Sequence, residues 1–565
     1  MTAADLQALA HDYWEFSLRE FPNLAHDVGD PRYGEELFHE SIADHSRRDA
    51  EAARLLARLA ELPVATLGGA DVMTARLLGR ELGEARERYA FGSHLRPELF
   101  PLGPEGSLGH AMQKTTLLRP SDAEQFVARL ETVPQFFDDH CERLRAGLAA
   151  GYRLPAVLLA RIRASVSGYV GAPLETQACY RPLAAAAARD PAAFGALATQ
   201  GQALVETRIV PAMGRWLEAL SDDYARSCRD SIGIREEPDG EAYYAFLARH
   251  FTTKSLTPAE IHATGLEEVA RIRAEMEAVA ARAGFPGDLA GLREHVSSDA
   301  RFAARDKEDL RERMEVLAKR IERRIPEFFG RIPRMTYGVD SIPEALAAQL
   351  PPAYAQPNPP SGTSAGVFWV TSLPERCRSY LHVPFALHEA WPGHLMHIAL
   401  LQEMTELPAF RRYGIANYTA YVEGWAMYCE KLGHDLGFYA DPFAHYGALD
   451  MEIWRAVRLV VDTGIHAFGW TRDRAIQYMG EQVALPRATI EAEIDRYIGW
   501  PGQALGYKIG ELTVSGLRAE ATRRLGERLD LRALHDRFSD AGPVTLDLLE
   551  THVREWIAAA AATPH

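Results

Sequence analysis

Apolar side chains recur at intervals of three and four residues along most of the chain. This spacing places them on one face of an α-helix and leaves the opposite face polar. Alanine, leucine, arginine and glutamate dominate these stretches, and all four favour helix. The pattern therefore predicts a mostly α-helical protein. It is clearest in six segments, residues 9–21, 49–62, 72–91, 122–151, 258–284 and 307–329.

The helical pattern is interrupted at residues 350–374. PPAYAQPNPPSGTSAG, residues 351–366, is rich in proline, glycine and serine, which excludes a helix there. VFWVTSL follows directly, and its β-branched and aromatic residues predict a short strand. We expect this β element to lie next to the motif that begins at residue 388.

A softer break at residues 230–240, DSIGIREEPDG, divides the chain into two parts. A chain of 565 residues has room for several domains or for one large enzyme with a deep cleft. We predict an N-terminal helical lobe over residues 1–240 and a lobe with the chemistry over residues 241–565. One continuous domain is the alternative.

Charge and cysteine usage narrow the class of protein. The formal net charge of −16 opposes nucleic-acid binding, which needs a basic surface. Five cysteines are scattered without a CxxC pair, which favours a reducing compartment. The start, MTAADLQALAHDYWEF, lacks the basic and apolar regions of a signal peptide, and no apolar run is long enough to span a bilayer. We expect a cytoplasmic protein with no membrane partner.

The first candidate for chemistry is HEAWPGH, residues 388–394. In the zinc-binding motif H-E-x-x-H, two histidines four residues apart share one helix face. Here His394 follows His388 by six residues, so an unbroken helix would turn the two rings roughly 120° apart. Pro392 disrupts a helix and Gly393 accepts unusual backbone angles, so the chain can return His394 to the face of His388. Glu389 then stands where a water-activating carboxylate belongs.

A zinc site needs about three protein ligands, and the third has to come from another element. YVEGWAMYCEKLG, residues 421–433, predicts a helix that ends at a glycine. Glu423 lies on it, 29 residues after His394, which suits a helix-turn-helix return. Glu430 shares the face of Glu423 seven residues later. It either supports the site or lies on a solvated surface.

HEAWPGH, EGWAMYCE and the later PGQALGYKIGE together resemble a bacterial family called domain of unknown function 885. Its members carry HEAxPGHxxQ, EGWAxYxE and PGQAxxYxxG, and the family is similar to the glutamate-ligand zinc peptidases. The resemblance implies a large helical, two-lobed, zinc-peptidase-like fold around a cleft. It also implies His388, His394 and Glu423 as the metal ligands and Glu389 as the base. One departure is His397, where the family has glutamine; it either hydrogen-bonds a ligand or competes as one.

Two residues compete to stabilise the negative charge that develops on a carbonyl oxygen during hydrolysis. Tyr507, in PGQALGYKIGE, is a neutral donor that follows a Trp-Pro-Gly turn. Its alternative is a structural place in the core. His466 shares a helix face with Arg458 and Asp462. Its alternative is a buried polar network between helices.

Several further residues are candidates for substrate binding. Lys508 either binds a substrate carboxylate or forms a salt bridge, and Gln503 belongs to the same motif. Arg458 joins this group. Tyr354 and the strand at residues 367–370 are expected to line the cleft, where the strand would pair with an extended peptide.

These features predict a metal-dependent hydrolase with one Zn²⁺, or another divalent ion, in each chain. Zinc activates water and polarises a carbonyl, so we expect a peptidase or amidase that acts on small peptide-like substrates. A hydrolase of a non-peptide amide or ester is the first alternative, and a non-catalytic helical metal-binding protein is the second. The sequence indicates no particular oligomeric state.

Overall fold

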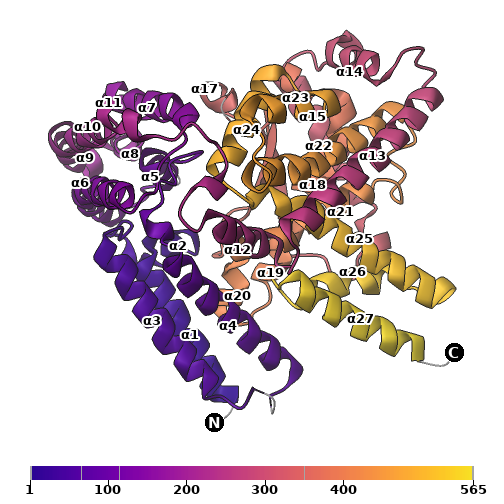
Figure 1. The fold of residues 1–565 in the computed structure, drawn as a ribbon, viewed down its shortest axis with the longest axis horizontal. Helices are drawn as coiled ribbons and strands as arrows, with labels where there is room; N and C mark the ends of the chain where they lie inside the picture. The colour runs from indigo at the N-terminus through magenta and orange to yellow at the C-terminus, as the bar shows by residue number, and fades with distance from the viewer. Residues whose placement is uncertain (1–2, 65–66, 114, 349, 563–565) are drawn as a thin grey trace. The chain divides into compact units, whose positions relative to one another are not determined.

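Helices form where the apolar periodicity predicts them. The computed structural model describes residues 3–64, 67–113, 115–348 and 350–562, and these are mostly helical with one small sheet (Figure 1). By its internal contacts the chain divides into two units, Met1–Tyr243 with Asp495–Trp500 and Tyr244–Ile494 with Pro501–His565. That the chain forms separate domains with a boundary at residue 240 stays a prediction.

The first unit contains the four N-terminal segments that the pattern assigns to helix. Helix α3 begins with a capping box, in which Ser41 and Asp44 satisfy each other's free backbone N–H groups. The helices of this unit are α1 (Ala3–Glu20), α2 (Pro22–Asp27), α3 (Ile42–Ala60), α4 (Gly69–Ala90), α5 (Pro104–Gln113), α6 (Pro120–Ala149), α7 (Ala156–Gly171), α8 (Arg181–Arg189), α9 (Pro191–Leu204), α10 (Val210–Ala219) and α11 (Asp222–Ser227), and α12 (Gly240–Thr252) crosses into the second unit.

The second unit holds every residue that the motifs single out. Thr257 and Glu260 form the capping box at the start of α13. The predicted helix over residues 307–329 is split, because Pro326 cannot continue it. The helices are α13 (Pro258–Arg282), α14 (Leu289–Ser298), α15 (Lys307–Glu322), α16 (Ile325–Phe328), α17 (Glu344–Ala347), α18 (His382–Glu389), α19 (His394–Gln402), α20 (Ala409–Tyr413), α21 (Thr419–Lys431), α22 (Pro442–His466), α23 (Arg472–Gln482), α25 (Gly506–Leu525), α26 (Leu531–Ser539) and α27 (Leu546–Ala562), and α24 (Arg487–Gly499) begins in this unit and ends in the first.

The predicted strand is β3 (Gly366–Val370), and it lies in the middle of a three-stranded sheet. It pairs in parallel with β1 (Tyr337–Ser341) and antiparallel with β2 (Ala353–Gln356). The prediction that residues 367–370 pair with a peptide is therefore wrong, because neighbouring strands occupy both edges of β3. Strand β2 is an edge of this sheet.

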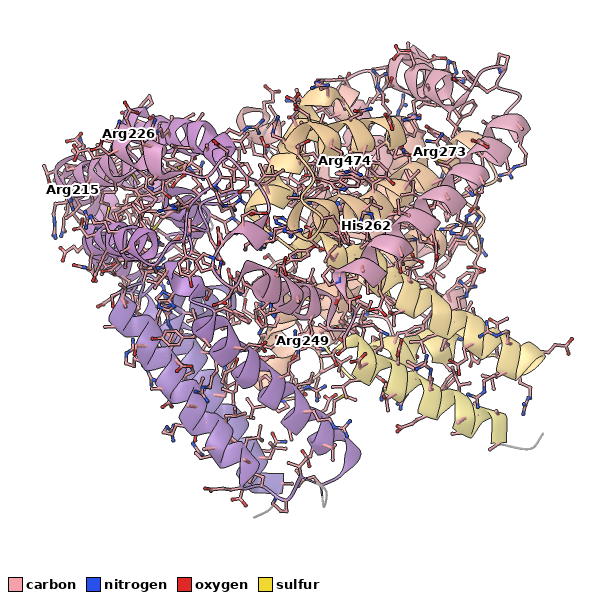
Figure 2. The ribbon with its side chains drawn as sticks, viewed as in Figure 1. Arg215, Arg226, Arg249, His262, Arg273 and Arg474 are labelled. Atoms are coloured by element: carbon pink, nitrogen blue, oxygen red, sulfur yellow. The ribbon has the colours of Figure 1, made fainter. Side chains whose placement is uncertain are left out.

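Close helix contacts hold the elements around the site. A Cβ atom on Gly424 of α21 would lie 2.4 Å from the carbonyl carbon of Gly510 on α25, so these helices meet backbone to backbone. Helix α13 packs along α22, where the imidazole of His262 lies 2.8 Å from the Thr463 hydroxyl. Figure 2 labels His262 and Arg273 on α13 and Arg474 on α23. Helix α22 also contacts α21 and α25, so the long helices α13, α21, α22 and α25 form one packed group.

Candidate metal centre

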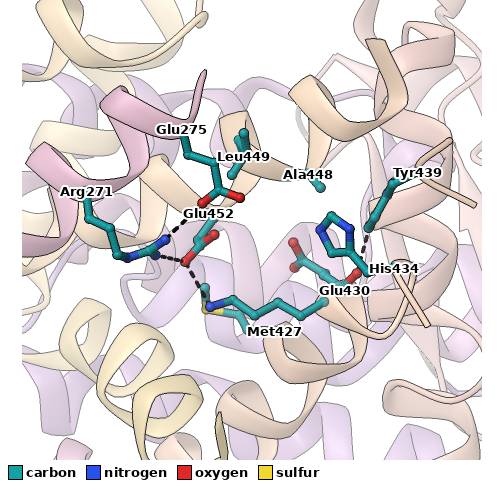
Figure 3. A pocket seen from close by; sticks show the side chains of 10 residues that line it. Arg271, Glu275, Met427, Glu430, His434, Tyr439, Ala448, Leu449 and Glu452 are labelled. Carbon is teal, nitrogen blue, oxygen red and sulfur yellow. Dashed lines mark hydrogen bonds and ion pairs between the residues drawn. The ribbon is translucent and has the colours of Figure 1, made fainter. Parts of the chain in front are cut away.

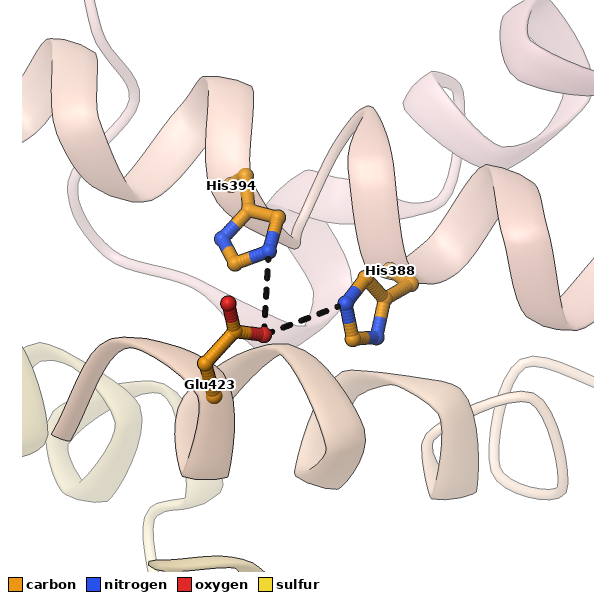
Figure 4. A group of neighbouring side chains, drawn as sticks. All are labelled: His388, His394 and Glu423. Carbon is orange, nitrogen blue, oxygen red and sulfur yellow. Dashed lines mark ion pairs between the residues drawn. The ribbon is translucent and has the colours of Figure 1, made fainter. Parts of the chain in front are cut away.

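His388, His394 and Glu423 come together in the second unit. His388 lies in the last turn of α18, His394 begins α19, and Glu423 projects from α21 toward both rings (Figure 4). One ligand atom from each residue lies within 4.8 Å of the others. In the described parts of the chain, no other group of His, Cys, Asp and Glu side chains converges in this way.

The turn between the two helices produces this convergence. The helix stops at Glu389 and restarts at His394, as expected from Pro392 and Gly393. A Cβ atom on Gly393 would lie 1.9 Å from the carbonyl oxygen of His388, so only glycine fits against the end of α18. The indole N–H of Trp425 donates to the Pro392 carbonyl at 3.0 Å and ties the turn to α21.

The two distances from Glu423 to the histidines fit a tetrahedral zinc ion. Glu423 Oε2 lies 3.5 Å from the Nε2 atoms of both His388 and His394. Two ligand atoms at usual zinc distances around a tetrahedral ion lie about 3.4 Å apart. Glu423 Oε2 is also buried and has no hydrogen-bond partner among the described residues. A cation between these atoms would satisfy it.

Charges around the centre favour a cation. Burial opposes a charge on His388, but the carboxylates of Glu389, Glu423 and Glu430 raise the pKa of its imidazole to about 10. Burial also opposes the ionised form of Glu423, yet His394 and His388 lower the pKa of its carboxyl far below its usual value. The exposed fraction rises from 5% for the His388 side chain to 20% for Glu423, so solvent approaches from the Glu423 side.

Glu430 orients His388 from the far side of its ring. The Nδ1–H group of His388 donates to Glu430 Oε1 at 2.7 Å, which directs the Nε2 atom of the ring at the centre. Arg455 of α22 lies 3.4 Å from the same oxygen, and the Tyr439 hydroxyl donates to the Glu430 carbonyl. Glu430 is 3% exposed, so the solvated-surface alternative is wrong. His394 differs, because no described residue bonds its Nδ1 atom.

Glu389 lies beside the centre without filling a ligand position. Its Oε1 atom is 4.0 Å from His388 Nε2, and its Oε2 atom accepts the backbone N–H of Ala355 in β2 at 2.9 Å. Burial raises the pKa of the Glu389 carboxyl above its usual value, the two histidines oppose this change, and Glu423 adds to it. A carboxylate with a raised pKa next to a metal centre suits proton transfer.

His397 points away from the three converging residues. The Tyr421 hydroxyl donates to the Phe538 carbonyl at 3.0 Å, so His397 Nε2 donates to Tyr421 at 3.2 Å. The imidazole also packs against the Trp425 ring. Burial, together with the nearby His394, lowers the pKa of His397 to about 3 and keeps the ring neutral. With Nε2 used in this way, His397 is not among the converging ligands.

The two candidate oxyanion donors lie on other helices. His466 is fully buried at the end of α22 and its ring packs against Tyr244, whose hydroxyl donates to Asp462 at 2.6 Å. This network matches the buried-network alternative more closely than an exposed donor. Tyr507 is half-buried on α25, and the Arg458 guanidinium lies over its ring, 4.6 Å from the centroid. The catalytic roles of both residues stay predictions.

The structure contradicts the substrate-binding role predicted for Lys508 and matches the salt-bridge alternative. Its side chain is fully buried, and its ammonium forms ion pairs of 2.6–2.8 Å with three carboxylates, those of Glu268, Glu452 and Glu511. An ammonium group has three N–H donors, and all three are used. Lys508 therefore does not bind a substrate carboxylate.

The structure shows the neighbours or the burial of the other residues predicted to bind substrate, which are Tyr354, Gln503 and Arg458. The ring of Tyr354 stacks on Trp369 with centroids 6.2 Å apart. Gln503 is 8% exposed and begins a short 3-10 turn. Arg458 is also buried and lies 3.4 Å from Glu493. Their roles in substrate binding stay predictions.

Sequence reasoning missed several contacts of the centre. Arg455 and Tyr439 belong to no motif, and Ala355 contributes only its backbone. Their one signal was indirect, because Glu430 shares the face of Glu423 and a buried glutamate needs partners. Which partners it would have was not readable from spacing.

The chain belongs to a bacterial family of proteins of unknown function, DUF885, whose family profile matches residues 22–553. The resemblance stated from the three motifs is thus confirmed at the level of the family. Among curated proteins, none matches the chain.

Two solved structures share the fold. One, described as "the putative lipoprotein from Colwellia psychrerythraea", is 26% identical, with 99% of each chain covered and a TM-score of 0.93. Another, "a putative lipoprotein of unknown function from Shewanella oneidensis", is 16% identical, with 99% of this chain and 100% of that chain covered and a TM-score of 0.74. None of the described helices is long and apolar enough to cross a membrane. The cytoplasmic location stays a prediction.

Proposed function

We propose that this protein is a zinc-dependent hydrolase, a peptidase or amidase for small peptide-like substrates, with the two-lobed fold of the zinc peptidases. One observation carries the proposal. His388, His394 and Glu423 converge, with Glu423 at zinc-ligand spacing from both histidines and with Glu389 beside them and clear of the ligand position. This is the set of parts that a hydrolytic centre requires.

Each residue has a distinct task in this proposal. The three ligands would hold Zn²⁺, which supplies a lowered water pKa and polarises the scissile carbonyl. Glu389 would accept the water's proton at Oε1, since its Oε2 atom is held by the Ala355 N–H, and pass that proton to the leaving amine. Glu430 would keep the Nδ1 proton on His388 and so keep Nε2 available.

The position of strand β2 at the edge of the sheet favours an extended peptide, rather than a compact ester, as the substrate. The Ala355 N–H group turns away from β3 and reaches Glu389, so the backbone groups of alternate β2 residues face the base rather than the sheet. A substrate strand at this edge would have its scissile bond near Glu389. Edge pairing replaces the predicted pairing with β3.

Tyr507 remains our candidate donor to the carbonyl oxygen. Helix α25 packs directly against α21, which carries Glu423, and this contact brings Tyr507 to the same group of helices. Tyr507→Phe is expected to lower kcat by about 10²- to 10³-fold while KM and metal content stay nearly constant. Single-turnover kinetics on purified protein measure this. If the Phe variant is only less stable and works normally once folded, the tyrosine is structural.

Metal analysis followed by a peptide digest tests the proposed function. The purified protein is expected to hold one divalent ion per chain. The His388→Ala and Glu423→Ala variants are each expected to contain much less metal. A peptide library should be cleaved by the native protein, spared after chelation, and cleaved again after zinc is restored. A protein that binds no divalent ion, or that cleaves equally well with chelator, would refute the proposal.

A further inference from the structure

A cavity of about 200 Å³ is lined in part by Glu430, whose Oε1 atom bonds His388 of the candidate metal centre (Figure 3). Helices α13, α21 and α22 form its walls. Its lining residues are Arg271, Glu275, Met427, Glu430, Lys431, His434, Tyr439, Ala448, Leu449 and Glu452. None of the tasks assigned above uses this cavity.

The lining carries more negative than positive charge. Its three carboxylates are those of Glu275, Glu430 and Glu452, and its two cations are Arg271 and Lys431. Both cations are already engaged. Arg271 pairs with Glu275 and Glu452, and Lys431 lies 3.1 Å from Glu452 and 2.7 Å from Glu511 outside the lining. Lys508 and Arg455, which lie outside the lining, also pair with Glu452 and Glu430. A further cation would therefore be held by a carboxylate oxygen that these pairs leave open, and not by an excess of negative charge.

Glu430 provides an anchor for that charge. The hydrogen bond from His388 and the ion pair with Arg455 both reach Oε1. Among the described residues, the hydrogen bond to the Glu430 carboxylate reaches Oε1 and none reaches Oε2, and Figure 3 shows the carboxylate of Glu430 directed into the cavity. The residue is 97% buried, since only 3% of its surface is exposed, so any solvent contact of Oε2 runs through this cavity.

The other walls determine the kind of cation. Met427, Ala448 and Leu449 form an apolar wall, which suits an alkyl chain. Burial lowers the pKa of His434, so its ring stays neutral and adds no repulsion. The described lining residues do not converge as metal ligands, which argues against an inorganic ion.

We propose that this cavity binds a primary alkylammonium group, with the ammonium at Glu430 Oε2 and Glu275 and the alkyl chain along Met427, Ala448 and Leu449. The ligand is an organic amine or a lysine-like side chain. Because Glu430 also orients His388, an ammonium on Oε2 withdraws negative charge from the His388 hydrogen bond. This second effect rests on the proposed metal centre, whereas the binding itself does not.

Binding is tested on metal-free protein with three probes of equal length: n-butylammonium, n-butanol and butyrate. Ligand-observed NMR titration should give an affinity for butylammonium at least tenfold above that for butanol, and no binding of butyrate. Glu275→Gln should weaken butylammonium binding at least threefold, and Ala448→Met, which fills the cavity, should abolish it. Glu277→Gln is the matched control, because Glu277 is exposed on the same helix outside the cavity. This variant should bind like the native protein.

Four results would overturn the proposal: no preference for the ammonium, binding of butyrate instead, native affinity in Glu275→Gln, or native affinity in a folded Ala448→Met variant. A second titration follows zinc affinity by chelator competition, and saturating butylammonium should weaken it several-fold. Zinc affinity that stays constant would overturn the coupling through Glu430. A protein that binds butylammonium but no zinc would refute the proposed function and leave the amine site standing.

Discussion

Glu389 and Glu430 both lie beside His388, yet their surroundings give them different tasks. Glu430 is held by His388 Nδ1 and Arg455, so it is a fixed acceptor. Glu389 receives one backbone N–H on Oε2, and its Oε1 atom faces the centre. At the scale of single residues, hydrogen-bond partners rather than residue type therefore separate a base from a positioning group.

Replacing Glu389 tests the base directly. Glu389→Gln is nearly isosteric but cannot accept the water's proton, so turnover should fall by about 10²- to 10⁴-fold. The metal content should not change, because Glu389 is not a ligand. Elemental analysis and initial rates on the same preparation measure both. Full activity in a metal-loaded Gln variant would place the base elsewhere.

Replacing Glu430 tests the support of His388. Glu430→Gln keeps an acceptor for the Nδ1–H group but removes its charge, so zinc affinity should fall by about 10- to 100-fold. Chelator competition measures the affinity. Glu406→Gln, an exposed glutamate in the loop after α19, is the control and should match the native protein. Unchanged zinc affinity in Glu430→Gln would show that the hydrogen bond does not orient a ligand.

At the scale of elements, the turn between α18 and α19 determines whether the two histidines meet. Six residues of continuous helix would separate the rings, and the Pro-Gly interruption removes that separation. Gly393 is essential to this geometry because its Cα lies against the backbone of His388. Local chain shape therefore produces the ligand spacing.

Gly393→Ala is expected to displace the start of α19 and move His394 from its place. Zinc affinity should fall about tenfold or more, as when a ligand loses its orienting contacts. Circular dichroism should still report a helical protein. Gly516→Ala on α25 is the control, since a Cβ atom there meets nothing within 4 Å and alanine favours helix. If Gly393→Ala binds zinc normally, the turn tolerates a side chain and our account of it is wrong.

At the scale of the whole molecule, Lys508 links three distant parts of the chain. Glu268 lies on α13, Glu452 on α22 and Glu511 on α25, and one buried ammonium joins them. Burial opposes its charge, but the three carboxylates raise the pKa of Lys508 above its usual value, so it stays protonated. The network stabilises the packing of these helices only while every partner is present.

Lys508→Met should therefore destabilise the protein. Removing the ammonium leaves Arg271 and Lys431 as the remaining partners of the three carboxylates, so negative charge stays buried, which costs about 3–5 kcal/mol of unfolding free energy. Urea unfolding followed by circular dichroism measures the change. Lys307→Met, which removes exposed ion pairs with Glu344 and Glu308, is the control and should change the unfolding free energy far less, because solvent screens these pairs. A stable Lys508→Met variant with a raised KM would restore the substrate-binding role.

The sequence by itself determined the helical class and the strand at β3, and it singled out the residues of the candidate metal centre. These features depend on short spacings: apolar residues at three and four, a β-branched run, and histidines around a Pro-Gly break. Such patterns involve residues close together in the chain, so they can be recognised from the sequence without knowledge of the fold. The family resemblance joined Glu423 to the histidines across 29 residues, and the structure brings the three together.

Tertiary structure alone decided what surrounds those residues. Lys508 meets Glu268 across 240 residues of chain, and Glu430 meets Arg455 on a different helix. Likewise, β3 became a central strand only because β1 and β2 flank it. Helix packing and burial determine partners of this kind, and the periodicity of apolar residues in the sequence does not indicate them. Burial changed the role of Lys508 because a charge removed from water has to be neutralised by whichever groups the fold brings to it.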